Sequence, residues 1–268
     1  MIPPLAASEV TSREPQSVRG PRSSAATMED ARPIPVTREP DPRKARGRRV
    51  MPAGTGSENL HRLLNSTLAA IGLLLVAPIM LVFAVLVKLG SPGPIFYRQP
   101  RVGLDRRRAT RAESDYDRRT RNLGGRPFMI LKFRTMRTNA EKDGPVWAVK
   151  SDARVTRVGR VMRRYRIDEL PQLVNVIRGE MNIVGPRPER PSIFSRLCDD
   201  IAEYPRRQRT RPGITGWAQV NQAYDTSVDD VRVKVRYDLE YLERQGVRED
   251  LMIMARTVPV VIFRRGGW

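Results

Sequence analysis

The sequence has 268 residues, enough for one domain of ordinary size with tails. Its 49 lysine and arginine residues outnumber 29 aspartate and glutamate residues, and the resulting formal charge of +20 predicts an anionic partner: nucleic acid, acidic lipid headgroups or a phosphorylated substrate. One cysteine and one histidine exclude an intrachain disulfide, a cysteine-based zinc site and a histidine-rich site, which leaves carboxylates, hydroxyls and lysines for chemistry and oxygen ligands for any metal.

Residues 1–58 are predicted to form a disordered tail. They are rich in proline, serine, arginine and glutamate and show no apolar periodicity. A basic cluster at residues 43–49 stands just before an apolar stretch. Such a cluster is either a solvated charge run or a segment attracted to anionic lipid, and the sequence leaves both interpretations open.

Residues 68–87 carry no charge and match the ~20 residues that a membrane-spanning helix needs. The run starts too deep in the chain for a signal peptide. Pro78, near its middle, removes a backbone hydrogen bond and is expected to kink or break the helix. Arg62 and Lys88 make both flanks basic, which favours a cytoplasmic position for both. We therefore predict a re-entrant membrane helix within residues 59–90, broken at Pro78, with a single kinked span as the alternative.

Residues 91–268 are predicted to form a compact cytoplasmic domain of the α+β class, mostly helical, with amphipathic helices on its surface. Residues 104–126 are dominated by arginine and aspartate and are interpreted as a charged mobile loop. Apolar periodicity elsewhere predicts a strand, then one basic amphipathic helix or a pair of short ones, and then two further helices, the last of which suits either a membrane surface or a core. In chain order these elements are residues 128–134, 151–166, 230–245 and 251–263.

Two adjacent carboxylates, Asp168 and Glu169, precede a predicted helix. Pro171 fits the first turn of that helix and Gly179 fits its C-terminus. Helix capping alone would account for both carboxylates, because acidic residues suit the positive end of the helix dipole. The other interpretation is catalytic: one carboxylate attacks phosphorus while the other holds a divalent cation that neutralises phosphates.

Cationic residues elsewhere favour the catalytic interpretation. Prolines on both sides of Arg187 fix the backbone and aim its guanidinium, whose planar fork suits a phosphate or carboxylate. The predicted strand carries Lys132 and Arg134. Arg211 opens a motif whose two glycines would let backbone amides approach a phosphate, although a lone Gly-x-x-Gly is most often a turn.

Five motifs in this order resemble the bacterial sugar transferase family, the monotopic polyprenyl-phosphate phosphoglycosyl transferases. The resemblance covers roughly residues 60–268 and is to the small single-anchor members. The motifs are Lys-Phe-Arg-Thr-Met at 132–136, Asp-Glu-Leu-Pro-Gln-Leu at 168–173, Gly-Glu-Met at 179–181, Val-Gly-Pro-Arg-Pro-Glu at 184–189 and Arg-Pro-Gly-Ile-Thr-Gly-Trp-Ala-Gln-Val-Asn at 211–221.

The resemblance implies transfer of a sugar 1-phosphate from a UDP-sugar to polyprenyl (undecaprenyl) phosphate. This step would initiate membrane-associated synthesis of an exopolysaccharide, capsule, O-antigen or glycoprotein glycan. By the same resemblance Asp168 is the nucleophile that forms a phosphosugar–enzyme intermediate, and Glu169 binds Mg²⁺. The residues that it assigns to substrate binding are Lys132, Arg134, Arg187, Arg211, Gln219 and Asn221.

The resemblance also implies a bacterial inner-membrane protein, in contact with membrane lipids, with its domain on the cytoplasmic face. A homodimer is compatible with it. No nucleic-acid partner is expected, because no nucleic-acid motif is present and the aromatic residues, 6% of the chain, are scattered. The high charge keeps a membrane-tethered nucleic-acid-binding protein as the alternative, and a non-catalytic scaffold of a glycan assembly complex as a third hypothesis.

Overall fold

The computed structural model describes residues 55–106, 124–140, 152–222 and 227–262, all within one compact unit. Most of the predicted tail and of the predicted 104–126 loop lies outside the described residues. The elements are α1 (Thr55–Gly90), β1 (Phe96–Val102), β2 (Pro127–Phe133), α3 (Arg157–Arg164), η2 (Ile167–Glu169), α4 (Gln172–Ile177), β3 (Asn182–Val184), α5 (Pro191–Asp200), η3 (Tyr204–Arg209), β4 (Gly213–Thr215), α6 (Trp217–Asn221), α7 (Val228–Arg244) and α8 (Val247–Ile262). The fold is α+β and mostly helical, as predicted.

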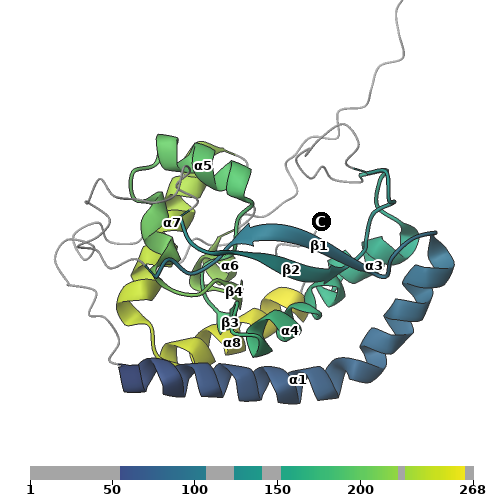
Figure 1. Cartoon of the computed structure of the whole chain (residues 1–268), viewed down its shortest axis with the longest axis horizontal. Helices are drawn as coiled ribbons and strands as arrows, with labels where there is room; N and C mark the ends of the chain where they lie inside the picture. The colour runs from purple at the N-terminus through teal and green to yellow at the C-terminus, as the bar shows by residue number, and fades with distance from the viewer. Residues whose placement is uncertain (1–54, 107–123, 141–151, 223–226, 263–268) are drawn as a thin grey trace, which may run out of the picture. The chain divides into compact units, whose positions relative to one another are not determined.

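Helix α1 is long, apolar and exposed along its outer side. Among the described residues it alone is long and apolar enough to cross a membrane, with a mean hydropathy of 2.9 over its most apolar stretch. It starts before the predicted boundary at residue 59 and continues through Pro78 without interruption. Figure 1 shows that α1 bends toward its C-terminal end. The helix is therefore bent, and its re-entrant course stays a proposal.

Both halves of α1 pack against the rest of the fold. Ala69, in the first half, lies in a core with Phe128 of β2, and Val87, in the second half, lies in a core with Met162 of α3. The opposite side of the helix exposes leucines to the surroundings: Leu74 and Leu75 are 76% and 77% exposed. One face of helix α1 thus packs against the domain, and the opposite, apolar face is exposed.

Polar contacts fasten the start of α1 to distant parts of the chain. His61 Nε2 lies 2.7 Å from Asp250 Oδ2 of α8. The Ile183 amide of β3 donates to Asn65 Oδ1 at 2.8 Å. Because Asn65 and Asp250 are both buried, each contact satisfies a polar group that would otherwise be costly to bury.

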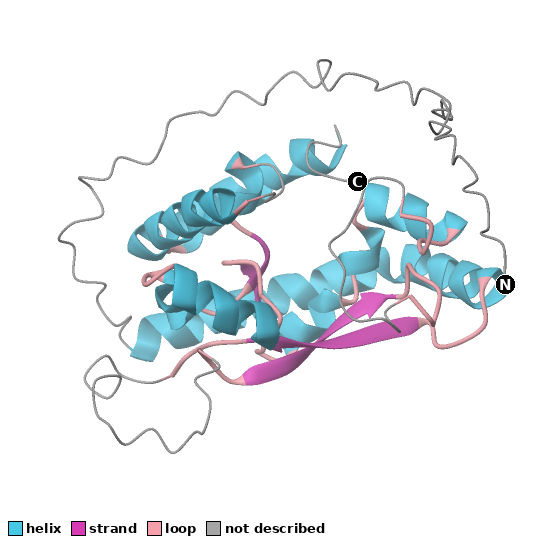
Figure 2. Ribbon diagram, turned by 90° about the horizontal axis from the view of Figure 1, so that it is seen from above, coloured by secondary structure: helices cyan, strands magenta, loops and turns pink. Residues whose placement is uncertain are grey.

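Two separate strand pairs support the helices (Figure 2). Strands β1 and β2 form an antiparallel ribbon in which Tyr97 pairs with Lys132. Strands β3 and β4 are short and parallel, with Asn182 opposite Gly213. The strand predicted at residues 128–134 is confirmed as β2.

The predicted helices in the second half of the chain are present with shifted ends. Helix α7 starts after Ser227, which forms a capping box with Asp230. Helix α3 is shorter than the predicted 151–166, because Thr156 caps it and the residues before the cap form turns. Helix α8 buries Ile253 and leaves Leu251 56% exposed, so one of its faces is in the core and the other is open.

Candidate active site

Asp168 and Glu169 lie on the short 3-10 helix η2, and helix α4 begins only after Pro171. The pair therefore lies one turn before α4, which argues against helix capping as the account of both carboxylates. Arg166, just before η2, has a left-handed backbone with φ of 57°, which costs about 1–3 kcal/mol in a residue other than glycine. Such strain gathers at functional sites, where the surrounding structure has to hold it. Gly179, with φ of 73°, follows α4 as predicted.

A buried asparagine fixes this segment against β2. Asn175 of α4 is fully buried, accepts a hydrogen bond from the Leu131 amide at 3.0 Å and donates to the Met129 carbonyl at 2.9 Å. These two backbone groups point outward along the free edge of β2, where they would otherwise lack partners. The clamp sets the distance between the carboxylate pair and the strand that carries Lys132.

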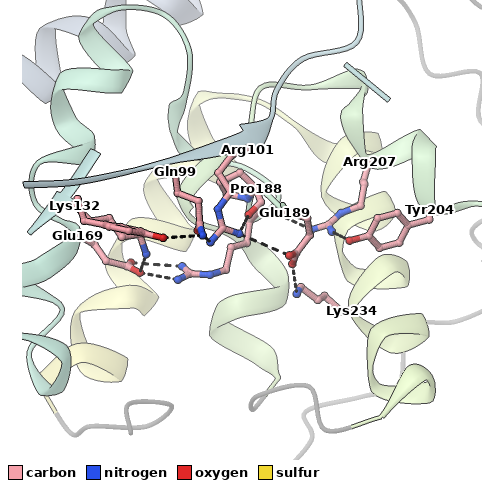
Figure 3. Close-up of polar contacts among 11 residues, drawn as sticks. Gln99, Arg101, Lys132, Glu169, Pro188, Glu189, Tyr204, Arg207 and Lys234 are labelled. Carbon is pink, nitrogen blue, oxygen red and sulfur yellow. Dashed lines mark hydrogen bonds and ion pairs between the residues drawn. The ribbon is translucent and has the colours of Figure 1, made fainter. Parts of the chain in front are cut away.

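Three cations surround Glu169. Arg187 Nη2 and Lys132 Nζ lie 2.6 Å and 2.9 Å from Glu169 Oε1, and Arg166 Nη1 lies 3.8 Å from it. We call these residues, with Asp168, the Glu169 cluster. Lys132 and Glu169 are labelled in Figure 3. Three cations face two carboxylates, so the cluster keeps positive charge that suits phosphate.

The surroundings of the cluster shift the pKa values of its two carboxyl groups in opposite directions. Burial alone would raise the pKa of Glu169, but Arg187 and Lys132 outweigh it and hold that pKa well below its usual range. Burial, helped by the neighbouring Glu169 charge, raises the pKa of Asp168. Burial also lowers the pKa of Lys132, against the pull of Glu169. Carboxyl groups with separated pKa values suit different chemical roles.

Asp168 keeps one oxygen available for chemistry. Its side chain is buried, and its Oδ1 atom has no hydrogen-bond partner in the described part of the chain. A buried and unpaired carboxylate oxygen is costly, so it calls for an explanation such as a catalytic role or an ion. Glu169, by contrast, uses both of its oxygens on Arg187.

The turn after β3 delivers Arg187. The Gly185 amide donates to the Thr215 carbonyl at 2.9 Å, which extends the β3–β4 pairing up to the turn. The Gly213 amide donates to the Pro186 carbonyl at 3.0 Å. A side chain on Gly216 would collide with the carbonyl of Gly185. The glycines of this motif therefore allow close packing. The Gly213 amide, which the sequence predicts to approach a phosphate, is instead bonded to the Pro186 carbonyl.

Two predicted phosphate ligands bind backbone elsewhere. Arg134 is buried and donates to the Ser91 carbonyl at 2.8 Å and the Pro92 carbonyl at 2.5 Å, so it holds the turn where α1 ends. Arg211 donates to the Gly179 carbonyl at 3.2 Å and pairs with Glu58 at 3.2 Å. Lys132 and Arg187 are brought to the carboxylate pair, whereas these two arginines fasten α1.

The remaining predicted ligands, Gln219 and Asn221, bond to nearby backbone. Gln219 donates to the Ile214 carbonyl at 3.1 Å, and Asn221 donates to the Trp217 carbonyl at 2.8 Å. Gln219 Oε1 is buried and without a hydrogen-bond partner in the described ranges. The assignment of both residues to substrate binding stays a prediction.

A second group of charges beside the cluster was missed at the sequence level. Figure 3 shows Glu189 between Arg101 and Lys234. Lys234 Nζ lies 3.4 Å from Glu189 Oε1, and Arg101 Nη1 donates to the Pro188 carbonyl at 2.9 Å. Glu189 closes the motif that contains Arg187, which is the one signal that could have found it. Arg207, which is also labelled in Figure 3, stands in a basic run whose sequence is typical of a solvated surface.

Comparison with known proteins gives a consistent picture. The family described as bacterial sugar transferase matches residues 56–264. The UDP-N-acetylgalactosamine-undecaprenyl-phosphate N-acetylgalactosaminephosphotransferase of Aeromonas hydrophila is 40% identical over 194 residues, which cover 72% of this chain and 41% of that protein. The UDP-glucose:undecaprenyl-phosphate glucose-1-phosphate transferase of Caulobacter vibrioides is 40% identical over 205 residues, 75% of this chain and 69% of that protein.

A third relative is similar over most of its length. The exopolysaccharide production protein ExoY of Sinorhizobium fredii is 35% identical over 234 residues, which cover 82% of this chain and 91% of that protein. The chain thus spans less than half of the Aeromonas protein and nearly all of the Sinorhizobium protein.

Proposed function

The chain belongs to the bacterial sugar transferase family, and on that premise we propose that it transfers a sugar 1-phosphate from a UDP-sugar to polyprenyl phosphate. Undecaprenyl phosphate is named as acceptor in similar proteins. The observation that supports the proposal best is the buried Asp168 Oδ1, which has no hydrogen-bond partner among the described residues and lies beside a carboxylate held by cations. Initiation of an exopolysaccharide, capsule, O-antigen or glycoprotein glycan is the role that follows.

The reaction would proceed by two displacements at one phosphorus. A carboxylate oxygen of Asp168 attacks the phosphate that bears the sugar, the anhydride bond to UMP breaks, and UMP leaves with the bonding electron pair. An oxygen of polyprenyl phosphate then attacks the same phosphorus, and the bond to Asp168 breaks. The products are a polyprenyl diphosphate sugar and the regenerated carboxylate.

The residues around Asp168 would support both steps. Lys132 and Arg187 carry positive charge to the place where phosphate charge builds up, and they are held there through Glu169. The raised pKa of Asp168 makes its carboxylate more basic, and hence a stronger nucleophile, than an ordinary aspartate. The strained Arg166 fixes the direction in which η2 presents this group.

We further propose that the site uses Mg²⁺. The ion is usually held by one or two carboxylates, with substrate phosphates and waters completing its shell. Glu169 is the carboxylate of the pair that fits this role: its Oε2 lies at a long 3.5 Å from Arg187 Nη1 and would turn to the ion, while Asp168 Oδ1 stays available for attack. When bound, the ion would neutralise the phosphates and stabilise the leaving group. Glu169 would share its charge between the ion and Arg187.

Helix α1 would bring the site to the lipid acceptor. The apolar side would be buried in the inner membrane, and the domain would lie on the cytoplasmic face. The two halves of α1 pack on the same domain through Ala69 and Val87. A helix that crossed the membrane could not keep both contacts with a domain on one face. These contacts therefore support the re-entrant course, with the bend near Pro78.

A donor panel tests the proposed reaction. The full chain in membrane vesicles would be incubated with Mg²⁺, polyprenyl phosphate and a series of UDP-sugars, and UMP release would be measured. We expect release from at least one donor and its loss in Asp168→Asn. Asp229→Asn, at a side chain that is 93% exposed, is the matched control and is expected to keep full activity. Release that survives in Asp168→Asn would contradict the mechanism and favour a scaffold.

A labelling experiment tests the proposed topology. Single cysteines before residue 60 and after residue 90, in a chain that lacks Cys198, are expected to react with impermeant reagents only from the cytoplasmic side. Protection of the position before residue 60 from the cytoplasmic side would instead favour one true span.

A further inference from the structure

A fully buried ion pair lies beside the Glu169 cluster. Arg207 of η3 is 0% exposed and Asp238 of α7 is 2% exposed, and Arg207 Nη2 lies 2.7 Å from Asp238 Oδ2. Arg207 Nη1 donates to the Tyr204 hydroxyl at 2.7 Å (Figure 3), and the guanidinium also lies 4.9 Å from the centre of the Tyr204 ring. Arg207 thus ties η3 to α7.

Such a pair is an expensive way to fill a core. Removing two charges from water costs several kcal/mol per ion, and apolar residues of similar volume often stabilise as well or better. Burial by itself would lower the pKa of Arg207, but Asp238 outweighs it and holds that pKa above its ordinary value. Arg207 therefore stays charged at every relevant pH. A permanent buried charge is explained if it fixes one arrangement of its neighbours.

The neighbour that Arg207 fixes is the turn that carries Arg187. Arg207 Nη2 donates to the Arg187 carbonyl at 3.0 Å. The next two carbonyls are held as well: Arg101 donates to that of Pro188, and the Val102 amide donates to that of Glu189, both at 2.9 Å. Pro186 and Pro188 have no backbone N–H to donate, so this turn is held mainly through hydrogen bonds that its carbonyls accept.

We infer that Arg207, held by Asp238 and Tyr204, is a positioning residue that fixes the Arg187 backbone and thereby aims the Arg187 guanidinium at Glu169 and the donor phosphate. This inference rests on the proposed function, since it assigns Arg207 a part in donor recognition. Arg207 is closed off from solvent, so we assign it no direct contact with the substrate. Arg207 acts on the Arg187 guanidinium through one hydrogen bond, which it donates to the backbone carbonyl of Arg187.

The test compares Arg207→Lys with Arg206→Lys, the same change at the exposed neighbour, whose ion pair with Glu203 is 3.0 Å long. The full chain in vesicles is assayed for UMP release, with the KM for the UDP-sugar and for polyprenyl phosphate determined separately. Lysine keeps the charge of Arg207 but cannot reach both Tyr204 and Arg187. We expect kcat/KM for the UDP-sugar to fall about ten- to hundredfold, as misplacement of a positioning group does. The KM for polyprenyl phosphate is expected to stay unchanged, and Arg206→Lys to match the wild type.

A double-substitution cycle separates positioning from a general structural role. If Arg207 acts through Arg187, Arg207→Lys costs no further activity in an Arg187→Ala background. An equal loss in both backgrounds, or a parallel rise in both KM values, would overturn the inference. If Arg207→Lys does not fold, Tyr204→Phe removes one hydrogen bond from the same guanidinium and is put through the same cycle. An Arg187→Ala protein with normal kcat/KM would instead contradict the donor role of Arg187 in the proposed function.

Discussion

Removing the charge of Lys132 tests the electrostatics of the site. In Lys132→Met the contact of 2.9 Å with Glu169 Oε1 is lost, between side chains that are 17% and 8% exposed. A hydrogen bond between charged groups contributes about 1.5–3 kcal/mol, which corresponds to roughly 10–150-fold in kcat/KM. The structure places this contact beside the nucleophile, so we expect the loss in transition-state stabilisation to fall in that range.

The same change is expected to move the pH profile. Asp168 must be ionised to attack, so the rate falls as the pH drops through its raised pKa. Lys132 is one of the charges that hold this pKa down, and its removal is expected to shift the acid limb to higher pH. Lys132 itself has a lowered pKa and loses its charge below the usual pH for lysine. The basic limb of the wild-type profile is therefore expected to be absent in Lys132→Met.

UMP release measured as kcat/KM across pH 5–10 would give both results, with Arg206→Met as the control. That residue forms an ion pair of similar length, 3.0 Å, between side chains that are 40% and 58% exposed. An exposed ion pair contributes only about 0–1 kcal/mol to stability. None of the described contacts of Arg206 is with the Glu169 cluster, so its removal should leave the site unchanged. A Lys132→Met protein within threefold of wild type, with both limbs at their original pH, would refute the electrostatic account.

Three further results are expected. Chelation of divalent cations is expected to stop UMP release and added Mg²⁺ to restore it; release that continues with chelator would exclude the proposed metal. Tyr241→Phe removes a buried hydroxyl that donates to Asp250 at 2.7 Å, so chemical denaturation is expected to show a loss of about 1–3 kcal/mol in the free energy of unfolding. Arg134→Met is expected to increase protease cleavage near Ser91 while leaving the KM for the UDP-sugar unchanged, whereas a tenfold rise in that KM would show that Arg134 binds phosphate.

The parts of the site that sequence reasoning found are those that local chemistry determines. Lys132 and Arg187 could be proposed because each stands in a short motif with a fixed backbone, and both contact Glu169. Pattern also located β2, α7 and α8, since apolar periodicity follows burial. An arginine in a motif shows that an acceptor is needed but does not say which one. Arg134 and Arg211 illustrate this: the sequence predicts that they bind phosphate, the structure shows them on the carbonyls of Ser91 and Gly179, and their part in substrate binding stays a prediction.

Other features depend on contacts between distant segments. Arg207 is buried because α7 brings Asp238 to it, and nothing near Arg207 in the sequence distinguishes it from the exposed Arg206. The clamp of Asn175 on β2 has the same origin. The short 3-10 helix η2 ahead of α4 is another such feature, since it follows the left-handed Arg166, a conformation that sequence does not foretell for arginine.

The contacts of α1 also set the order of events during synthesis. Helix α1 is synthesised well before its partners: Ile183 lies 118 residues after Asn65, and Asp250 lies 189 residues after His61. Contacts at such separations are among the slowest to form. If α1 is anchored in the membrane as proposed, the bilayer receives the apolar helix while most of its protein partners do not yet exist. On that proposal the membrane would substitute temporarily for these partners, and the domain would close onto a helix that had already been inserted.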